Sequence, residues 1–286
     1  MFIVEKPYAS EFLIDTIVQN DLPVLDNETI RNAAFEDGTL DILPAEQARD
    51  YYLTQEYPLI YSNSENAISW VLENLPNSNL ANYIKFFKDK AAFRELLRDI
   101  YPNFYFETVE FDELKKLNAR DLKYPFVIKP AVGFLSLGVH TVHEQNDWKD
   151  VLSIITKEME NAQSLYPSNV INSSKFIMEE LIEGEEYAID AYYDRNGDPV
   201  ILNIFRHPFL NDRDVSDRIY LMSTEIMIKY MAKFALLLRQ IGEMKDIRNF
   251  PLHLEVRVTK DEVIIPIEIN PMRFAGWCTT DVAKYA

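Results

Sequence analysis

The chain has 286 residues, of which 29 are Lys or Arg and 46 are Asp or Glu, so its formal net charge at pH 7 is −17. This negative charge argues against general nucleic-acid binding, because phosphate backbones are held by clustered Lys and Arg. A hydrophobic content of 48% excludes intrinsic disorder, and no apolar run is long enough for a membrane-spanning helix. The single cysteine, Cys278, cannot form an internal disulfide, which indicates a reducing cytoplasm.

Residues 1–82 alternate short apolar runs with polar turns, a pattern that predicts a small α/β domain. The expected strands cover residues 2–4, 39–43 and 58–61, and the expected helices cover residues 45–52 and 65–75. No recognisable motif marks this part of the chain.

Residues 83–286 are expected to form a second, larger domain. The expected helices cover residues 82–98, 112–117, 145–160 and 224–241, the last with Ser223 or Thr224 as its N-cap and Gly242 as its stop. The expected strands cover residues 105–109, 126–129, 175–181, 187–193, 200–205, 253–259 and 263–269. Residues 280–286 resemble the opening turn of a helix, so we expect a truncated C-terminus or an abrupt end.

The last predicted hairpin carries the strongest chemical signal. Glu268 and Asn270 lie two residues apart on its second strand, so their side chains are expected on one face. Glu255 lies thirteen residues before Glu268, about the separation that brings the two together across a hairpin. Two carboxylates and an amide oxygen would form an all-oxygen site suited to Mg²⁺. The alternative is ordinary solvent-facing glutamates.

A second signal is a lysine at a strand end followed by a loop with glycines. Lys129 ends the predicted strand, and the loop contains Gly133, Ser136 and Gly138. Glycines let backbone amides approach an anion closely and the lysine adds positive charge, so this segment could bind phosphate. The run is neither a Walker loop nor a dinucleotide fingerprint, and an ordinary hairpin turn is the alternative.

A third signal is the acidic segment from Glu179 to Glu186, which follows an apolar strand. Its extended backbone could offer C=O and N–H groups to the edge of a purine. Glu186 could accept hydrogen bonds from ribose hydroxyls. The alternative is an acidic surface loop.

Other polar residues give weaker signals. The pair Asp89-Lys90 is by itself typical of a solvated surface pair. Arg257 shares a strand face with Glu255, so we expect it either to bind phosphate or a substrate carboxylate, or to form a surface salt bridge. The arginine-containing segment 205–218 could receive an anionic substrate. His207 and His253 are expected to be packed or solvated side chains rather than site residues.

In chain order these residues resemble the ATP-grasp superfamily, which includes D-alanine–D-alanine ligase, biotin carboxylase and amino-acid ligases. The resemblance covers about residues 85–286, and Glu255 with the run Glu268-Ile269-Asn270-Pro271 is its most specific part. It implies an α+β fold in which two subdomains of residues 83–286 grip the nucleotide, the lid being about 110–180. Many members have Asn-Pro-Arg after the second glutamate, whereas here Met272 separates Pro271 from Arg273.

The resemblance also implies a role for each matching residue. The nucleotide phosphates would be bound by Lys90, Lys129, Gly133, Ser136 and Gly138. Adenine and ribose would be held by Glu179, Glu180, Leu181, Ile182 and Glu186. Mg²⁺, as two ions with Mn²⁺ as a substitute, would be coordinated by Glu255, Glu268 and Asn270. The catalytic contacts to the transferred phosphate or a substrate carboxylate would come from Arg273 and Arg257.

The implied activity is an ATP- and Mg²⁺-dependent ligase that activates a carboxylate as an acyl phosphate for capture by an amine. Its expected partners are small-molecule carboxylate and amine substrates, with no nucleic acid and no membrane, and a homodimer is the default assembly. The alternatives are another ATP-grasp activity (phosphotransferase, thiol ligase or carboxylase subunit) and a nucleotide-binding module without turnover.

Overall fold

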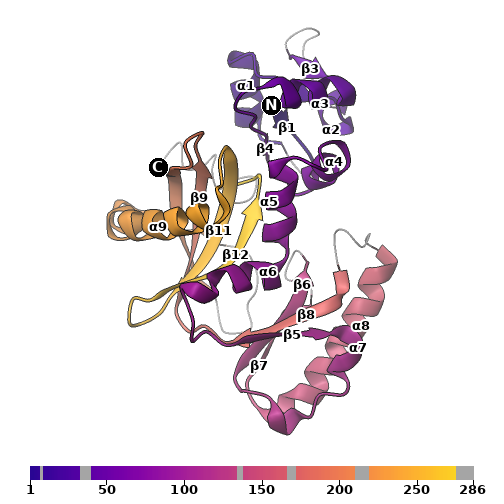
Figure 1. Cartoon of the computed structure of the whole chain (residues 1–286), viewed down its shortest axis with the longest axis vertical. Coiled ribbons are helices and arrows are strands. Elements are labelled where there is room, and N and C mark those ends of the chain that lie inside the picture. Colours follow the sequence, from indigo (N-terminus) through magenta and orange to yellow (C-terminus); the bar gives the residue numbers. More distant parts are fainter. Residues whose placement is uncertain (7–8, 33–39, 134–137, 166–171, 210–218, 275–286) are drawn as a thin grey trace.

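The computed structural model describes residues 1–6, 9–32, 40–133, 138–165, 172–209 and 219–274. Within them the chain forms three four-stranded sheets that follow one another along the long axis of the molecule (Figure 1). From one end of this axis to the other, we call them the N-terminal sheet, the central sheet and the lid sheet. None of the helices in the described residues has the length and apolar character needed to cross a membrane.

The N-terminal sheet is parallel and has the strand order β3-β2-β1-β4. Its strands are β1 (Phe2–Ile3), β2 (Val24–Leu25), β3 (Ile42–Leu43) and β4 (Tyr61–Ser62). Its helices are α1 (Glu11–Gln19), α2 (Glu28–Asn32), α3 (Ala45–Thr54) and α4 (Ala67–Asn74). The sequence interpretation missed α1, β2 and α2. Strand β2 has only two residues, which is too short to show an alternating pattern.

The helical segment that leads from the N-terminal sheet to the lid sheet is divided in two. Instead of one helix over 82–98, the chain forms α5 (Asn79–Lys88), α6 (Lys90–Leu96) and the 3₁₀ turn η1 (Leu97–Asp99). Asp89 adopts an extended conformation between the helices, and its side chain accepts hydrogen bonds from the backbone N–H groups of Ala91 and Ala92. An Asp in this position caps a helix start, so Lys90 becomes the first residue of α6. Helix α5 also crosses the predicted domain boundary at residue 82.

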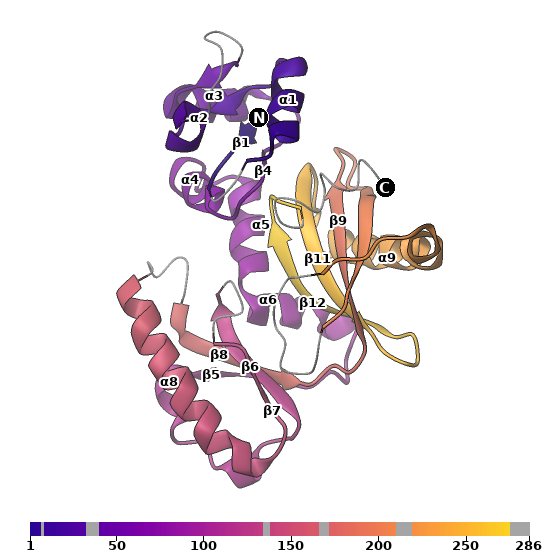
Figure 2. The same ribbon diagram turned by 180° about the vertical axis from the view of Figure 1, so that it is seen from behind.

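The lid sheet is antiparallel, with the order β5-β8-β6-β7, and α8 lies along one of its faces in both views (Figures 1 and 2). Its strands are β5 (Phe106–Glu110), β6 (Phe126–Val132), β7 (His140–Val142) and β8 (Asn172–Glu180). Its helical elements are α7 (Phe111–Leu114), η2 (Ala119–Asp121), η3 (Gln145–Asp147) and α8 (Trp148–Leu165). Trp148, Ile155 and Met159 pack on Phe126 and Ile128 in a core that belongs to this sheet alone.

The central sheet is antiparallel, with the order β10-β9-β11-β12. Its strands are β9 (Glu185–Tyr193), β10 (Pro199–His207), β11 (Phe250–Val258) and β12 (Ile264–Pro271). Helix α9 (Thr224–Lys245), capped by Ser223, covers one face, where Tyr193 donates a hydrogen bond to the backbone oxygen of Leu238. Side chains alternate along a strand, so Glu186, Asp190, His253 and Glu255 point to the opposite face.

Gly242 does not end α9, contrary to the expectation from the sequence. The helix continues to Lys245 and ends at Asp246, which has a left-handed conformation. A Cβ atom on Gly242 would lie 2.5 Å from a ring carbon of Tyr193. The glycine therefore permits close packing of the helix on β9.

The largest core cluster joins the N-terminal sheet to the central sheet. It contains Ile3, Leu25 and Ile60 together with Phe87 of α5 and Phe250 of β11. The rings of Phe87 and Phe250 stack with centroids 5.7 Å apart. Burial of this shared apolar surface fixes where the N-terminal sheet lies relative to the polar face of the central sheet.

Candidate functional site

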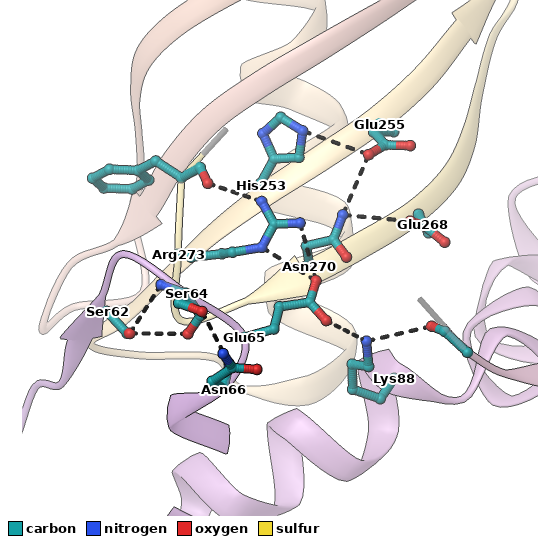
Figure 3. Close-up of polar contacts among 12 residues, drawn as sticks. Ser62, Ser64, Glu65, Asn66, Lys88, His253, Glu255, Glu268, Asn270 and Arg273 are labelled. Carbon is teal, nitrogen blue, oxygen red and sulfur yellow. Dashed lines mark hydrogen bonds and ion pairs between the residues drawn. The ribbon is translucent and has the colours of Figure 1, made fainter. Parts of the chain in front are cut away.

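The candidate site lies on the polar face of the central sheet, near the end of β12. Glu255 on β11 is directly opposite Glu268 on β12, as the hairpin spacing predicts. The Asn270 side-chain nitrogen lies 3.3 Å from Oε1 of Glu255 and 3.4 Å from Oε1 of Glu268 (Figure 3). The two carboxylates are only about a quarter exposed, at 25% and 23%. The three predicted metal-ligating residues are therefore adjacent.

The two carboxylates differ in their electrostatic surroundings. Burial raises the pKa of Glu255, and the negative charge of Glu268 raises it further. Burial alone would also raise the pKa of Glu268, but the Lys90 ammonium, 2.7 Å from its Oε2, outweighs this and holds the pKa at about 2. The Lys90 side chain is 13% exposed and pairs with Glu268, so it is not the solvated surface residue that Asp89-Lys90 by itself indicated.

These residues fit a magnesium ion. In the described part of the chain no three His, Cys, Asp or Glu residues lie together as metal ligands. A cation here would rest on Glu255 and Glu268, and on the amide oxygen of Asn270 once that side chain turns its nitrogen away from the two carboxylates. Mg²⁺ accepts such a set, because it commonly takes one or two carboxylates and completes its shell with water and substrate phosphates. It would also relieve the repulsion that raises the pKa of Glu255.

Lys129 and Glu179 form a buried ion pair between neighbouring lid strands β6 and β8. The Lys129 ammonium lies 2.5 Å from Oε1 of Glu179, and the Arg94 guanidinium of α6 lies 3.0 Å from Oε2. Burial would raise the pKa of Glu179, but these two cations lower it. Arg94 also donates to the backbone oxygen of Pro266 on β12, so it ties the lid sheet to the central sheet.

The predicted adenine segment is the connection from β8 to β9. The backbone N–H of Glu180 donates to the Tyr105 carbonyl at 3.0 Å, and the Glu180 carboxylate accepts from the Tyr105 N–H at 3.2 Å. The Leu181 N–H donates to the Pro125 carbonyl at 3.4 Å. The carbonyl of Ile182 accepts a hydrogen bond from Arg257 at 2.8 Å. These contacts place the segment at the junction of the lid and central sheets.

Glu186 and Arg257 face each other across β9 and β11. The Arg257 Nε atom donates to Oε2 of Glu186 at 3.1 Å, and Nδ1 of His207 lies 3.1 Å from Oε1. Glu186 is 10% exposed and Arg257 28%, so this ion pair is partly buried. Its position, on the same sheet face as Glu255, leaves both residues beside the candidate metal ligands.

Arg273 is held by Glu65, which lies between β4 and α4. Its Nε and Nη2 atoms donate to Oε1 of Glu65 at 3.2 and 3.0 Å, while Lys88 of α5 contacts Oε2 of Glu65 at 2.7 Å (Figure 3). Burial would raise the pKa of Glu65, but the charges of Arg273 and Lys88 lower it to about 2. The additional residue Met272 has a left-handed conformation, with φ of 66°, directly before Arg273.

The glycine loop is described only at its two ends. Gly133 lies just after β6, and its carbonyl is 3.5 Å from the Lys88 ammonium. Gly138 has φ of +74°, and a Cβ there would lie 2.9 Å from a Met159 carbon and 3.0 Å from Pro130. A larger residue would therefore separate the loop from α8. Ser136 lies outside the described residues, as do 210–218 of the arginine-containing segment, Cys278 and residues 280–286.

Among the described residues, six polar residues join the site although the sequence interpretation did not place them there. They are Glu65, Lys88, Arg94, Asp190, His207 and His253. His253 is buried beside Glu255. Burial would lower its pKa, but contacts with Asp190 and Glu255 raise it to about 9. The two-residue spacing of His253 and Glu255 on one strand is a signal that could have identified it.

Comparison with known proteins fits this geometry. The profile of the ATP-grasp domain matches residues 122–281, more than half of the chain. The chain belongs to the ATP-grasp family. This membership confirms the predicted α+β ATP-grasp fold class.

Two sets of relatives illustrate the similarity. A D-alanine–D-alanine ligase of Anaplasma marginale (strain Florida) is 30% identical over 115 residues, 37% of this chain and 34% of that protein. The chain thus matches about a third of the length of its curated relatives. The structure of an L-amino acid ligase from Bacillus licheniformis is similar, with a TM-score of 0.66 and 17% identity. The match covers 99% of this chain and 68% of the ligase. A biotin carboxylase from Campylobacter jejuni has a TM-score of 0.67 and 12% identity, and the match covers 98% of this chain and 67% of the carboxylase. The solved structures share the fold.

Proposed function

We propose that this ATP-grasp protein is an ATP- and Mg²⁺-dependent carboxylate–amine ligase. It activates a small-molecule carboxylate as an acyl phosphate, which an amine captures with formation of a C–N bond and release of ADP and phosphate. The observation that carries this proposal is the cluster of Glu255, Glu268 and Asn270 with the Lys90 ammonium at its edge. Such a cluster meets the requirement of phosphoryl transfer, which is positioning and charge neutralisation.

Each part of the site has a proposed task. Lys90, Lys129 and the loop with Gly133, Ser136 and Gly138 bind the nucleotide phosphates. Adenine and ribose are held by Glu179, Glu180, Leu181, Ile182 and Glu186. Glu255, Glu268 and Asn270 hold two Mg²⁺ ions, for which Mn²⁺ can substitute. When bound, these ions neutralise phosphate charge. Arg273 and Arg257 bind the transferred phosphate or the substrate carboxylate.

The roles proposed for Arg257 and Arg273 include an exchange of partners. Arg257 is bound by Glu186 and Arg273 by Glu65, so an anionic substrate reaches either guanidinium only by sharing or replacing that carboxylate. The domain division at residue 82, a cytoplasmic location and a homodimer stay predictions. The relative named as an L-amino acid ligase supports amino acids as the first carboxylates and amines to test.

The test is ADP release from the full chain with ATP, Mg²⁺ and a panel of amino acids. We expect release that depends on an added carboxylate, and in the presence of hydroxylamine we expect a hydroxamate, which reports an acyl phosphate. ADP release without hydroxamate would indicate phosphorylation of another acceptor. No release with any substrate of the panel, at an intact Mg·ATP affinity, would favour a binding module.

Glu268→Gln tests the metal cluster itself. Loss of one carboxylate ligand should lower turnover at least about 100-fold, the upper end of the loss seen when residues supporting a metal ligand are changed. Glu262→Gln, in the turn of the same hairpin and bound to surface Lys229 and Lys233, is the matched control and should keep its activity. Equal activity of both variants would contradict the metal assignment.

A further inference from the structure

His253 occupies one row of the central sheet with two other polar residues. On β11 it pairs in register with Asp190 of β9 on one side and with Asn270 of β12 on the other. The next row on the same face contains Glu255 opposite Glu268. Thus the polar row of His253 lies directly behind the carboxylates of the candidate metal site.

Both ring nitrogens of His253 face a carboxylate. Nδ1 lies 2.8 Å from Oδ1 of Asp190. Nε2 lies 3.6 Å from Oε1 of Glu255, and Figure 3 draws this second contact. The side chains of His253 and Asp190 are 2% and 0% exposed. A fully buried carboxylate is costly unless it is paired, so Asp190 holds the imidazole in this orientation and the imidazole in turn compensates Asp190.

The contacts of Glu255 are confined to one of its oxygens. His253 and the Asn270 amide nitrogen both approach Oε1. Among the described residues, Oε2 of Glu255 takes part in no hydrogen bond or ion pair. This arrangement fixes the rotation of the carboxylate about its last bond and leaves one oxygen available to a ligand.

We propose that His253, held by Asp190, is a positioning residue that orients the Glu255 carboxylate toward the bound divalent cation. This inference rests on the metal site of the proposed function. Groups behind a metal ligand orient it, and their loss weakens metal binding although they do not touch the ion. A purely structural His–Asp pair would instead affect folding and metal-free nucleotide binding.

Two substitutions separate the two ring contacts of His253. In His253→Asn the amide nitrogen can replace Nδ1 toward Asp190 but cannot reach Glu255. In His253→Gln the longer side chain can place its amide near the position of Nε2, beside Glu255. His140→Asn is the matched control, because His140 also pairs with a carboxylate, that of Glu158 at 2.8 Å, but in the lid.

The measurement is calorimetric ADP binding to the full chain, once with Mn²⁺ and once with EDTA. The affinity gained from Mn²⁺ should fall about 10-fold in His253→Asn, as expected for a group behind a metal ligand, while ADP affinity in EDTA stays unchanged. His253→Gln should keep most of the gain, and His140→Asn all of it. The Mn²⁺ electron paramagnetic resonance spectrum of each complex reports the altered coordination directly.

The outcomes distinguish this inference from the proposed function. A full Mn²⁺ gain in His253→Asn, together with a lost gain in Glu268→Gln, would overturn the role of His253 but retain the metal site. An unchanged gain in Glu268→Gln would reject the metal site itself. If His253→Asn does not fold in thermal unfolding, His253→Gln decides, because a gain as low as that of Glu268→Gln would contradict the inference.

Discussion

Glu65, between β4 and α4, is a carboxylate that reaches the candidate site from the N-terminal part of the chain. Its backbone lies in a turn in which the Ser62 hydroxyl donates to the Ser64 carbonyl at 2.9 Å and the Asn66 N–H donates to the Ser64 hydroxyl at 3.2 Å (Figure 3). The turn presents a side chain that is 22% exposed between two cations. The ionised form of Glu65 is therefore strongly favoured.

Glu65→Gln should destabilise the protein in a pH-dependent manner. The pKa of Glu65 is lowered from 4.5 to about 2, so its ion pairs stabilise the fold fully above pH 4.5 and are lost as the pH falls toward 2. At pH 7 the variant should lose about 2 kcal/mol of unfolding free energy, the scale of hydrogen bonds to charged groups. Urea unfolding of both proteins measures this difference.

The difference between the wild type and Glu65→Gln should shrink as the pH is lowered through this window, because protonation of Glu65 then removes the same charge. Glu56→Gln, on an exposed part of the N-terminal domain, is the control for a general loss of negative charge. A pH-independent difference would contradict the ionised role of Glu65.

The residues that sequence could and could not predict differ in the range of their contacts. Glu255, Glu268 and Asn270 were predictable, because a hairpin and a two-residue period bring them together locally. Glu65 and Arg273 are 208 residues apart, and nothing near either residue indicates their contact. The inserted Met272 was visible in the sequence, but its left-handed conformation, and hence the direction of Arg273, was not.

At the scale of elements, the break between α5 and α6 decides where Lys90 lies. The continuous apolar pattern over 82–98 predicts one helix, whereas the structure has a cap at Asp89. Asp89 accepts hydrogen bonds from Ala91 N–H at 2.9 Å and Ala92 N–H at 3.1 Å. A local side-chain hydrogen bond overrides the periodic pattern here, because Asp competes for backbone N–H groups. The break directs Lys90 toward Glu268.

Asp89→Ala should weaken both the helix start and nucleotide binding. Loss of the cap should cost about 1 kcal/mol of unfolding free energy. The Lys90 ammonium should also lose its fixed position next to Glu268, which would raise the Kd for Mg·ATP. Asp89→Asn keeps a capping oxygen and is the control. Denaturant unfolding and calorimetry measure the two effects, and an unchanged Kd in Asp89→Ala would show that the cap does not position Lys90.

The long, periodic elements were the most predictable from the sequence. Helix α9 and the β11–β12 hairpin lie close to their expected ranges, since each buries one regular apolar face. Among the short strands of the N-terminal sheet, β1 and β3 lie within their expected ranges, whereas β4 is displaced and β2 was missed. Their pairing comes from parallel neighbours distant in the chain, such as Phe2 with Tyr61. Such pairing leaves little trace in a two-residue segment.

At the scale of the whole molecule, the two largest hydrophobic cores of the described residues are separate. The larger one joins the N-terminal sheet, α5 and the central sheet, and a separate one lies between the lid sheet and α8. Regions with separate cores can open independently, because unfolding one does not expose the other. The division of the core therefore predicts that the lid sheet and the central sheet differ in their local stability.

Hydrogen exchange of the full chain should show this division. Amides of β6 and β8 should exchange through an opening of lower free energy than amides of β9 and β11, and the N-terminal strand β1 should exchange together with the central sheet. The control is exchange in denaturant approaching the unfolding transition, where all regions should converge. Equal opening free energies for the lid and central sheets in water would contradict two separable cores.

Two segments of backbone connect the lid sheet to the rest of the chain, one entering at Tyr105 and one leaving at Glu180. Tyr105 and Glu180 are hydrogen-bonded to each other, so both connections lie on one line. Any swing of the lid about that line displaces nearby atoms least and remote atoms most. Residues 180–182 lie on the rotation axis of such a movement, and Gly133 lies far from it. A ligand that contacts both would therefore be displaced little at one end and much more at the other.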